Sequence, residues 1–377
     1  MARIVSPRKA AIGGETVERV GPFLYGPPDD GSFQGSDVTA ATGAIRTIAI
    51  LSNNEGLGDC IRSLYMLRAL KRALPESRIS WYSTPVSPFA GVLGGLVSEF
   101  VAEVRERVTM ERPFGLAVRT LRGLPPADLV IDTRTAFKRV AMARLFMRHR
   151  RFVTGCFGLS WGATWGYLTA PRHHFLERRL DLVRRATGVE PDWQGRPPVA
   201  AAARAIAARL VPDGRRAVAL APGLGTGLQL RRWPLDRFIA LARRLEGEGD
   251  LPVFLLGPLE FATAAAIRAA LPGAVVLDAA MAEQAPVLDL TMALAERVAY
   301  GIVHDSAVCH ILATFGVPLV AIFGETFERR AHPFAVRYVA VCAQDFGGND
   351  AALVPLEAVA DAAFALRAEL AGEARPP

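Results

Sequence analysis

The stretch NNEGLGDC, residues 53–60, ends a short apolar run and presents one acid, Asp59, before a long helical pattern. Glycines after a strand let the backbone approach a ligand closely, and the N-terminus of a helix attracts anions. Asp59 therefore has two roles open to it. It caps the helix, which is worth about 0.5 to 2 kcal/mol, or it takes part in chemistry. The stretch lacks the GxGxxG pattern of dinucleotide-binding folds.

A second stretch, PGLGTGLQLRRWP at residues 222–234, lies between an expected strand and an expected helix. Its three glycines and Thr226 offer backbone and hydroxyl donors. Arg231 and Arg232 can neutralise a diphosphate with guanidinium groups of fixed geometry. The stretch lacks GxxxxGK[ST], which argues against a P-loop nucleotide hydrolase. It indicates a phosphate-binding loop, with an ordinary surface loop as the alternative.

A third stretch, VHDSAVCHILATFGVPLVAIFG at residues 303–324, combines a strand end with a short helix. An Asp-Ser-small sequence after a strand turns backbone N–H groups toward the sheet edge. His304, Asp305 and His310 do not have the HExxH spacing of a zinc site, and Ser306 lacks the GxSxG context of a nucleophile. We therefore expect neither a metal site nor acyl transfer here.

A fourth stretch, GCFGLSWGATWGYL at residues 155–168, places Trp161 and Trp165 among glycines. Tryptophan is well suited to a membrane surface because it combines an apolar ring with a polar N–H group. The stretch is either an ordinary loop or short strand, or an aromatic lip that contacts a lipid-linked acceptor.

The elements that must position these residues alternate between strands and helices. In the first half we expect strands at 45–51, 78–83 and 127–134 and helices at 60–74 and 140–150. In the second half we expect strands at 216–223 and 251–257, and helices at 234–249 and 356–370. Two similar α/β units of this kind predict facing domains with a ligand cleft at the carboxyl ends of their strands.

The expected division of the chain follows its composition. Residues 1–44 are rich in glycine, proline and aspartate and read as an N-terminal extension, a tail or a surface wrap. We expect one domain at 45–200, a second at 213–345 and a C-terminal helix at 353–372.

The net charge of +7 favours anionic partners, among them an anionic membrane surface. No basic run is interleaved with aromatic residues, so nucleic acid is the least favoured partner. The four cysteines show no CxxC spacing and nothing resembles an export signal, which predicts a reducing cytoplasm. Neither uncharged window of spanning length, 79–98 or 152–171, looks like a transmembrane helix.

Three motifs in register resemble glycosyltransferase family 9, the ADP-heptose:lipopolysaccharide heptosyltransferases. They are Gly58-Asp59 after the first strand, Arg231-Arg232-Trp233-Pro234 after the phosphate loop, and the stretch from Asp305 to His310 followed by FGVPLVAIFG. The similarity runs over residues 45–334. It implies a GT-B fold, with two facing Rossmann-like domains and a cleft between them.

The resemblance also implies chemistry. The N-terminal domain holds the acceptor, the C-terminal domain holds a nucleotide-sugar substrate such as ADP-heptose, and neither a metal nor a cofactor takes part. Asp59 is then the general base. One carboxylate suffices because an inverting displacement removes one proton and the diphosphate leaves unprotonated. We place Gly58, Trp161 and Trp165 on the acceptor side, the two tryptophans because of the aromatic stretch described above. The cysteine usage predicts a cytoplasmic enzyme, and the basic net charge predicts peripheral contact with the inner face of the membrane.

On the donor side the resemblance implies eight residues: Thr226, Arg231, Glu260, Asp305, Ser306, Ala307, Val308 and His310. Thr226 and Arg231 bind the diphosphate, and the backbone at 306–308 caps it at a helix N-terminus. Asp305 holds sugar hydroxyls, His310 orders the loop, and Glu260 contacts the ribose.

Three features depart from the family pattern. Ala307 replaces the usual glycine of the late motif, and FGETFERR replaces the usual Gly-Pro-Thr-Asp-Pro. The long N-terminal extension at residues 1–44 is not part of the ordinary pattern. These changes leave three alternatives open: a transferase with another donor or acceptor, a non-catalytic sugar-nucleotide-binding protein in which Asp59 is only a cap, and a sugar-nucleotide epimerase.

Overall fold

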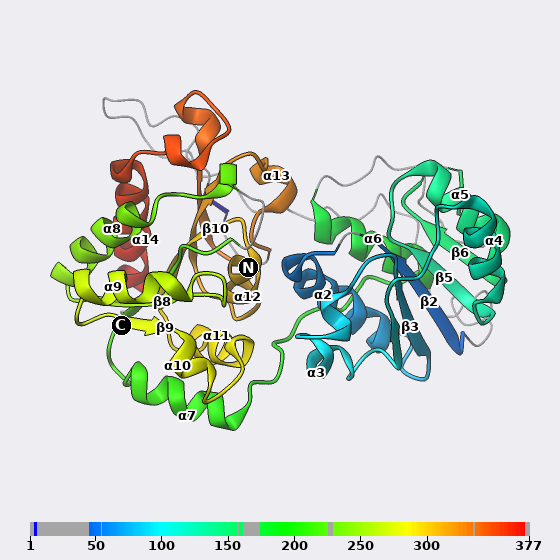
Figure 1. Cartoon of the computed structure of the whole chain (residues 1–377), viewed down its shortest axis with the longest axis horizontal. Helices are drawn as coiled ribbons and strands as arrows, with labels where there is room; N and C mark the ends of the chain where they lie inside the picture. Colours follow the sequence, from blue (N-terminus) through cyan, green and yellow to red (C-terminus); the bar gives the residue numbers. More distant parts are fainter. Residues whose placement is uncertain are drawn as a thin grey trace. The chain divides into compact units, whose positions relative to one another are not determined.

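The computed structural model describes residues 4–5, 45–53, 55–156, 158–160, 174–224, 229–334 and 336–373 (Figure 1). The chain forms two compact units. The first unit is Tyr25–Gly195, and the second combines Met1–Leu24 with Arg196–Pro377. Each is an α/β unit built on one parallel sheet, and each is described by itself below.

The first unit has a five-stranded sheet in the order β4-β3-β2-β5-β6, with every pairing parallel. The strands are β2 (Thr47–Ser52), β3 (Arg78–Ser83), β4 (Glu103–Arg105), β5 (Ala127–Asp132) and β6 (His149–Thr154). The helices are α2 (Leu57–Ala73), η1 (Pro88–Ala90), α3 (Gly94–Val97), α4 (Phe114–Gly123), α5 (Phe137–Phe146) and α6 (Phe175–Thr187).

Helices cover both faces of this sheet, which explains why its central strands are continuous apolar runs rather than alternating ones. Ala49 and Leu51 of β2 share one core with Leu121 of α4 and Val140 of α5. Helices α2 and α6 pack against each other and cover the other face (Figure 1).

The second unit has a seven-stranded parallel sheet in the order β1-β12-β11-β10-β7-β8-β9. Its strands are β1 (Ile4–Val5), β7 (Ala217–Ala221), β8 (Leu251–Leu255), β9 (Val275–Leu277), β10 (Tyr300–His304), β11 (Leu319–Phe323) and β12 (Tyr338–Cys342). Strand β1 pairs with β12, so residues from the start of the chain extend the sheet of the second unit.

The α-helices of the second unit are α7 (Ala201–Leu210), α8 (Leu235–Gly247), α9 (Ala264–Ala270), α10 (Ala279–Ala282), α11 (Val287–Ala295), α12 (Ala307–Thr314), α13 (Glu328–Ala331) and α14 (Leu356–Glu373). Its short 3-10 turns are η2 (Gln229–Arg231), η3 (Phe261–Thr263), η4 (Ala343–Phe346) and η5 (Ala351–Leu353).

The predicted helix at 140–150 is wrong at both ends. Helix α5 begins at Phe137 and ends at Phe146, where Met147 turns to an extended conformation. His149 and Arg150 then belong to β6, which pairs with β5. Basic residues are common both on the surface of a helix and at the start of a strand. The local pattern therefore did not mark the boundary between α5 and β6.

Candidate functional site

Asp59 is the third residue of α2, at the carboxyl edge of the first sheet. Its Oδ2 accepts a hydrogen bond from the Gly56 backbone N–H at 3.2 Å, and its Oδ1 accepts one from Arg62 Nη2 at 2.6 Å. Gly58 precedes it on the same turn and is half-buried. The Asp59 side chain is 29% exposed. It therefore caps the helix and still presents a carboxylate to solvent.

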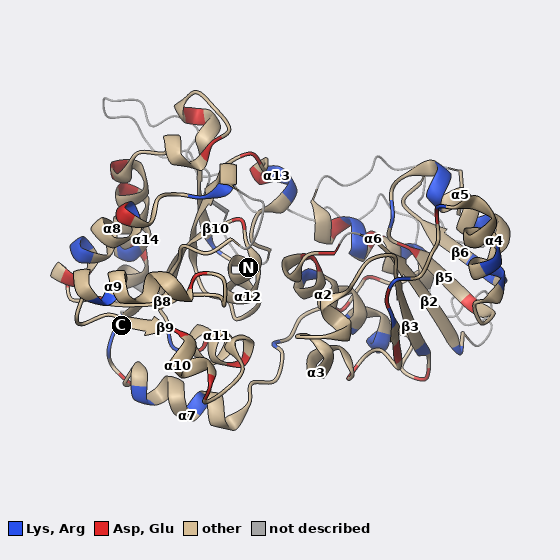
Figure 2. Cartoon of the chain, in the orientation of Figure 1, with Lys and Arg blue, Asp and Glu red and all other residues tan. Residues whose placement is uncertain are grey.

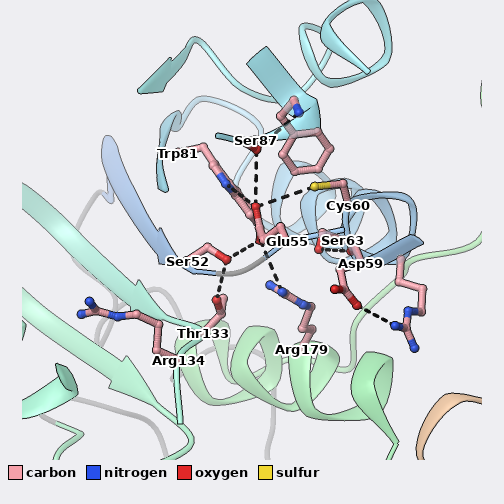
Figure 3. Close-up of polar contacts among 12 residues, drawn as sticks. Ser52, Glu55, Asp59, Cys60, Ser63, Trp81, Ser87, Thr133, Arg134 and Arg179 are labelled. Atoms are coloured by element: carbon pink, nitrogen blue, oxygen red, sulfur yellow. Dashed lines mark hydrogen bonds and ion pairs between the residues drawn. The ribbon is translucent and has the colours of Figure 1, made fainter. Parts of the chain in front are cut away.

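Glu55 lies in the loop between β2 and α2 and makes the densest polar contacts near Asp59 (Figure 3). Its side chain is 1% exposed. Trp81 Nε1 donates to the carboxylate at 3.1 Å, and Ser52 Oγ donates to it as well. Ser87 Oγ and Cys60 Sγ approach it at 3.5 and 3.7 Å. Glu55 thus ties the loop that leads into α2, the helix that carries Asp59, to residues of β2 and β3.

Arg179 of α6 is the cation that faces this carboxylate. Its Nη2 lies 3.5 Å from Glu55 Oε1, and the whole side chain is buried. The guanidinium groups of Arg179 and Arg62 both lie against the Phe175 ring, 4.4 and 4.1 Å from its centroid. Within the described part of the chain, Nε and Nη1 of both arginines are buried without a hydrogen-bond partner. Two cations are therefore held beside Asp59 by stacking as much as by ion pairing.

Burial shifts both members of the pair. Burial raises the pKa of Glu55, and the nearby Arg179 charge opposes that shift without cancelling it. Burial likewise lowers the pKa of Arg179, against the attraction of Glu55. Both shifts have the same cause, because a low-dielectric interior disfavours the charged form of either group.

A raised pKa makes stability depend on pH in a defined direction. Above the reference value of 4.5, folded Glu55 still holds a proton that the unfolded chain has released. We compare the free energy of unfolding of the wild type with that of Glu55→Gln. This difference is expected to fall as the pH rises from 4.5 through the higher pKa of folded Glu55, and to be flat at lower pH. Urea unfolding of both proteins at several pH values measures this difference. A difference that is constant, or that grows with pH, contradicts the prediction.

In the second unit, Arg231 ends η2 and contacts two acids. Its Nη1 lies 3.4 Å from Asp305 Oδ2, and its Nε donates to Glu325 Oε1 at 3.0 Å. The Arg231 side chain is 27% exposed. The structure thus brings together Arg231 and Asp305, which the sequence placed in separate motifs, and adds Glu325.

Gly324 explains how η2 reaches this position. A Cβ atom on Gly324 would lie 2.1 Å from the Leu230 carbonyl oxygen and 3.0 Å from Arg231 Cα. Because these are backbone or near-backbone atoms, no side-chain rotation relieves the clash. Only glycine at the end of β11 lets the η2 segment cross it.

Helix α12 begins beside Asp305. Ser306 is its N-cap, with Oγ accepting from the Cys309 N–H at 3.5 Å, and Ala307 and Val308 form its first turn. His310 is buried, with Nε2 3.7 Å from Asp305 Oδ1. The expected helix N-terminus at 306–308 is therefore present, and alanine at 307 keeps its backbone N–H.

His304 has a structural position. Its Nε2 accepts the Trp233 backbone N–H at 2.7 Å, and its ring meets the Phe238 ring edge to face. Burial lowers the pKa of His304 to about 3. Among the residues that the structure describes, no three His, Cys, Asp or Glu side chains are grouped to hold a metal ion.

Glu260 lies at the carboxyl edge of the second sheet, over two glycines. A Cβ on Gly223 would lie 2.7 Å from Glu260 Oε2, and a Cβ on Gly257 would lie 2.9 Å from the same oxygen. Glu260 is buried. The glycines that follow β7 and β8 thus make room for this carboxylate.

Three expected site residues, Thr226, Trp161 and Trp165, lie outside the described residues. Sequence reasoning missed Glu55, Arg179 and Glu325. The partners of Glu55 at Trp81 and Arg179 are distant in sequence, so no local spacing marks them. The available signal was an acid within a glycine-containing loop directly after a strand. No helix in the described ranges is both long and apolar enough to cross a membrane.

Comparisons with known proteins give the same fold. Three solved structures are similar over most of their length. Glycosyl transferase family 9 from Veillonella parvula DSM 2008 has a TM-score of 0.63 and 16% identity, covering 86% of this chain and 97% of that one. E. coli ADP-heptose LPS heptosyltransferase II has a TM-score of 0.59 and 19% identity, and the match covers 88% of this chain and 100% of that one. E. coli heptosyltransferase WaaC with ADP has a TM-score of 0.56 and 17% identity, and the match covers 86% of this chain and 99% of that one.

These identities establish the fold, and the predicted GT-B-like α/β architecture with two parallel sheets is confirmed. No curated protein matches the chain. The family itself follows from a family model, glycosyltransferase family 9 (heptosyltransferase), which matches residues 118–351, more than half of the chain. The chain therefore belongs to glycosyltransferase family 9, the heptosyltransferase family.

Proposed function

We propose that this protein is an inverting, metal-independent glycosyltransferase that moves a heptose from ADP-heptose to a hydroxyl of a lipopolysaccharide-type or other glycan acceptor. The domain at 45–200 binds the acceptor, and the domain at 213–345 binds the nucleotide sugar. The observation that carries the proposal is the partly exposed Asp59 carboxylate, held in place by Gly56 and Arg62.

Asp59 acts as the general base. It takes the proton from the acceptor hydroxyl while that oxygen bonds to the anomeric carbon and the bond to the diphosphate breaks. The diphosphate leaves with the bonding electrons and needs no proton, so one carboxylate is sufficient. Such base assistance is typically worth about 10² to 10⁴ in rate.

The donor side supplies electrostatic stabilisation. Arg231 and Thr226 bind the diphosphate, and the backbone N–H groups of Ala307 and Val308 at the start of α12 add partial positive charge. Asp305, which lies between Arg231 and His310, binds hydroxyls of the sugar. His310 orders this loop, and Glu260 contacts the ribose.

The choice of ADP-heptose as donor is supported by structures of E. coli heptosyltransferase WaaC with ADP and with ADP-2-deoxy-2-fluoro heptose. The pairing of Arg231 with Glu325 supports a second candidate. Glu325 belongs to the segment that departs from the family pattern and contacts a donor-side residue. A transferase that uses another nucleotide sugar is therefore the alternative.

Direct binding separates the two candidates. Calorimetry and thermal shift with ADP, ADP-heptose, UDP and GDP are expected to show binding by ADP and ADP-heptose. Preference for UDP or GDP would replace the donor and keep the reaction class. If none of the four compounds binds, both transferase candidates lose their support and the proposal is overturned.

Arg231→Gln is expected to weaken ADP binding by about ten-fold, since a hydrogen bond to a charged group contributes about 1.5 to 3 kcal/mol and Arg231 must leave two carboxylates to bind a diphosphate. Isothermal calorimetry measures the change. Arg209→Gln, an exposed arginine on α7, is the matched control. An unchanged Kd for Arg231→Gln would remove Arg231 from the donor site.

The proposed place of action is the cytoplasmic side of the membrane, where a glycolipid acceptor is available. The protein would associate with that surface peripherally.

A further inference from the structure

Helices α4 and α5 expose four large apolar side chains within twenty residues of helix. Phe114 is 63% exposed, Leu116 46%, Phe137 62% and Leu145 73%. Scattered single apolar residues are normal on a protein surface, but a group on two neighbouring helices marks an interaction surface.

The charges on these two helices all have one sign. They carry Arg119, Arg122, Lys138, Arg139 and Arg144 and contain no acidic residue, as the blue segments of α4 and α5 in Figure 2 show. Arg139 pairs with Glu111 outside the helices, at 2.9 Å. Across the described residues, Arg119, Arg122 and Lys138 have no acidic side chain within ion-pair distance, and all three are exposed.

The two helices form one continuous surface. The Phe114 and Phe146 rings meet edge to face at 6.1 Å, and the Arg122 guanidinium lies over the Phe146 ring at 5.4 Å. Leu121 and Val140 point the other way, into the core of the first unit. The inner faces of α4 and α5 are thus used for folding, and their outer faces combine apolar and basic groups.

This surface belongs to the unit that carries Asp59. Strand β5 ends at Asp132, and α5 begins at Phe137 after four intervening residues. In that short connection, Thr133 Oγ1 lies 3.3 Å from Ser52 Oγ, and Ser52 in turn donates to Glu55. The start of α5 is therefore fixed to the same sheet edge as the proposed acceptor site.

We propose that the outer face of α4 and α5, here called the α4–α5 surface, docks on the anionic headgroups of a lipid bilayer. The phenyl and leucyl side chains enter the interface between headgroups and acyl chains, and the arginines and lysine meet the lipid phosphates. Exposed phenyl and leucyl side chains beside Arg119, Arg122 and Lys138 favour a lipid surface, because apolar groups bordered by basic ones are the composition that binds anionic membrane interfaces. This inference rests on the proposed function, because it supplies the surface from which a glycolipid acceptor is taken.

The test is flotation of the full chain with vesicles. Vesicles of equal parts phosphatidylglycerol and phosphatidylcholine are expected to carry the protein at low salt, and vesicles of phosphatidylcholine alone are not. Added salt is expected to release part of the bound protein, because screening weakens contacts between exposed charges.

Two variants probe the two kinds of contact. Arg119→Gln with Arg122→Gln is expected to weaken binding about 25-fold, since each basic residue near an anionic surface contributes a factor of about five. Phe114→Ser with Phe137→Ser is expected to weaken it by about ten-fold or more. The matched controls are Arg209→Gln with Arg215→Gln, two exposed arginines of the second unit, and the exposed Leu353→Ser.

Equal loss in the arginine variant and its control would mean that overall charge, not this surface, attracts the lipid, and would overturn the proposal. Failure of the wild type to float with anionic vesicles would also overturn the proposal, even if the surface were then found to bind an acidic protein. Thermal melting shows that each variant is folded. ADP binding in solution requires no vesicle and tests the proposed function separately. Absence of ADP binding by the wild type would count against the proposed function. A variant that binds ADP but no longer floats would support the docking surface.

Discussion

Replacing Asp59 with asparagine is expected to lower kcat by about 10²- to 10⁴-fold while leaving ADP binding unchanged. Asparagine keeps a side-chain oxygen that can accept the Gly56 N–H, so the helix cap is largely preserved. It cannot take a proton from an acceptor hydroxyl, and it loses the charge pair with Arg62. Release of ADP and of the glycosylated acceptor, followed by mass spectrometry, gives the rate.

The matched control is Asp289→Asn. Asp289 is also the third residue of its helix, α11, and lies in the second unit. It is expected to change stability modestly and activity little. An active Asp59→Asn protein would reduce Asp59 to a cap and favour the non-catalytic alternative or a different base. An inactive one that still binds ADP and melts near the wild-type temperature would support the base.

Removing the carboxylate at Glu55 is expected to have the largest effect on stability. At a pH where Glu55 is ionised in the folded protein, Glu55→Leu leaves the buried Arg179 without its ion-pair partner, and breaking a buried pair from one side costs about 3 to 5 kcal/mol. It also leaves the Trp81 N–H without its acceptor. Urea unfolding of the purified variant measures the loss.

A double-mutant cycle with Arg179→Met separates the ion pair from the other contacts. The Glu55→Leu, Arg179→Met double variant is expected to be more stable than Glu55→Leu alone, because no unpaired charge remains buried. The free energy of unfolding of the double variant is still expected to be about 1 to 3 kcal/mol lower than that of the wild type, because the Trp81 N–H lacks its acceptor. Additive single effects would show that the two charges do not interact. The exposed pair of Arg72 and Asp192 serves as the control, with little change expected.

The sequence predicted the architecture well because parallel α/β units repeat a strong pattern. Apolar runs of five or six residues alternate with amphipathic helices, and β3 at Arg78–Ser83 matches its predicted range. Helix α2 begins three residues before the predicted start, at Leu57, because Asp59 caps from inside the first turn rather than from before it. Local spacing shows that an acid is near a helix start but does not fix the register.

The motifs single out Arg231 and Asp305, and the structure brings these two side chains together. Their assignment to the donor side stays a prediction. The pairing of Arg231 with Glu325, and of Glu55 with Arg179, depends on long connections that fold back to the same sheet edge. Composition and periodicity describe one segment at a time, so they do not reveal which charged side chains meet. That information lies in the topology.

The space around Glu260 couples three positions of the sequence. Gly223 and Gly257 both face its carboxylate oxygen, at distances that leave no room for a Cβ unless that side chain shifts. The obstructing oxygen is the end of a side chain, so an alanine at either glycine can be accommodated by rotation of Glu260 or by its replacement with a shorter residue. Either change moves the carboxylate from its present position. Lineages that keep the Glu260 carboxylate in place are therefore expected to keep both glycines, although the three positions are spread over nearly forty residues.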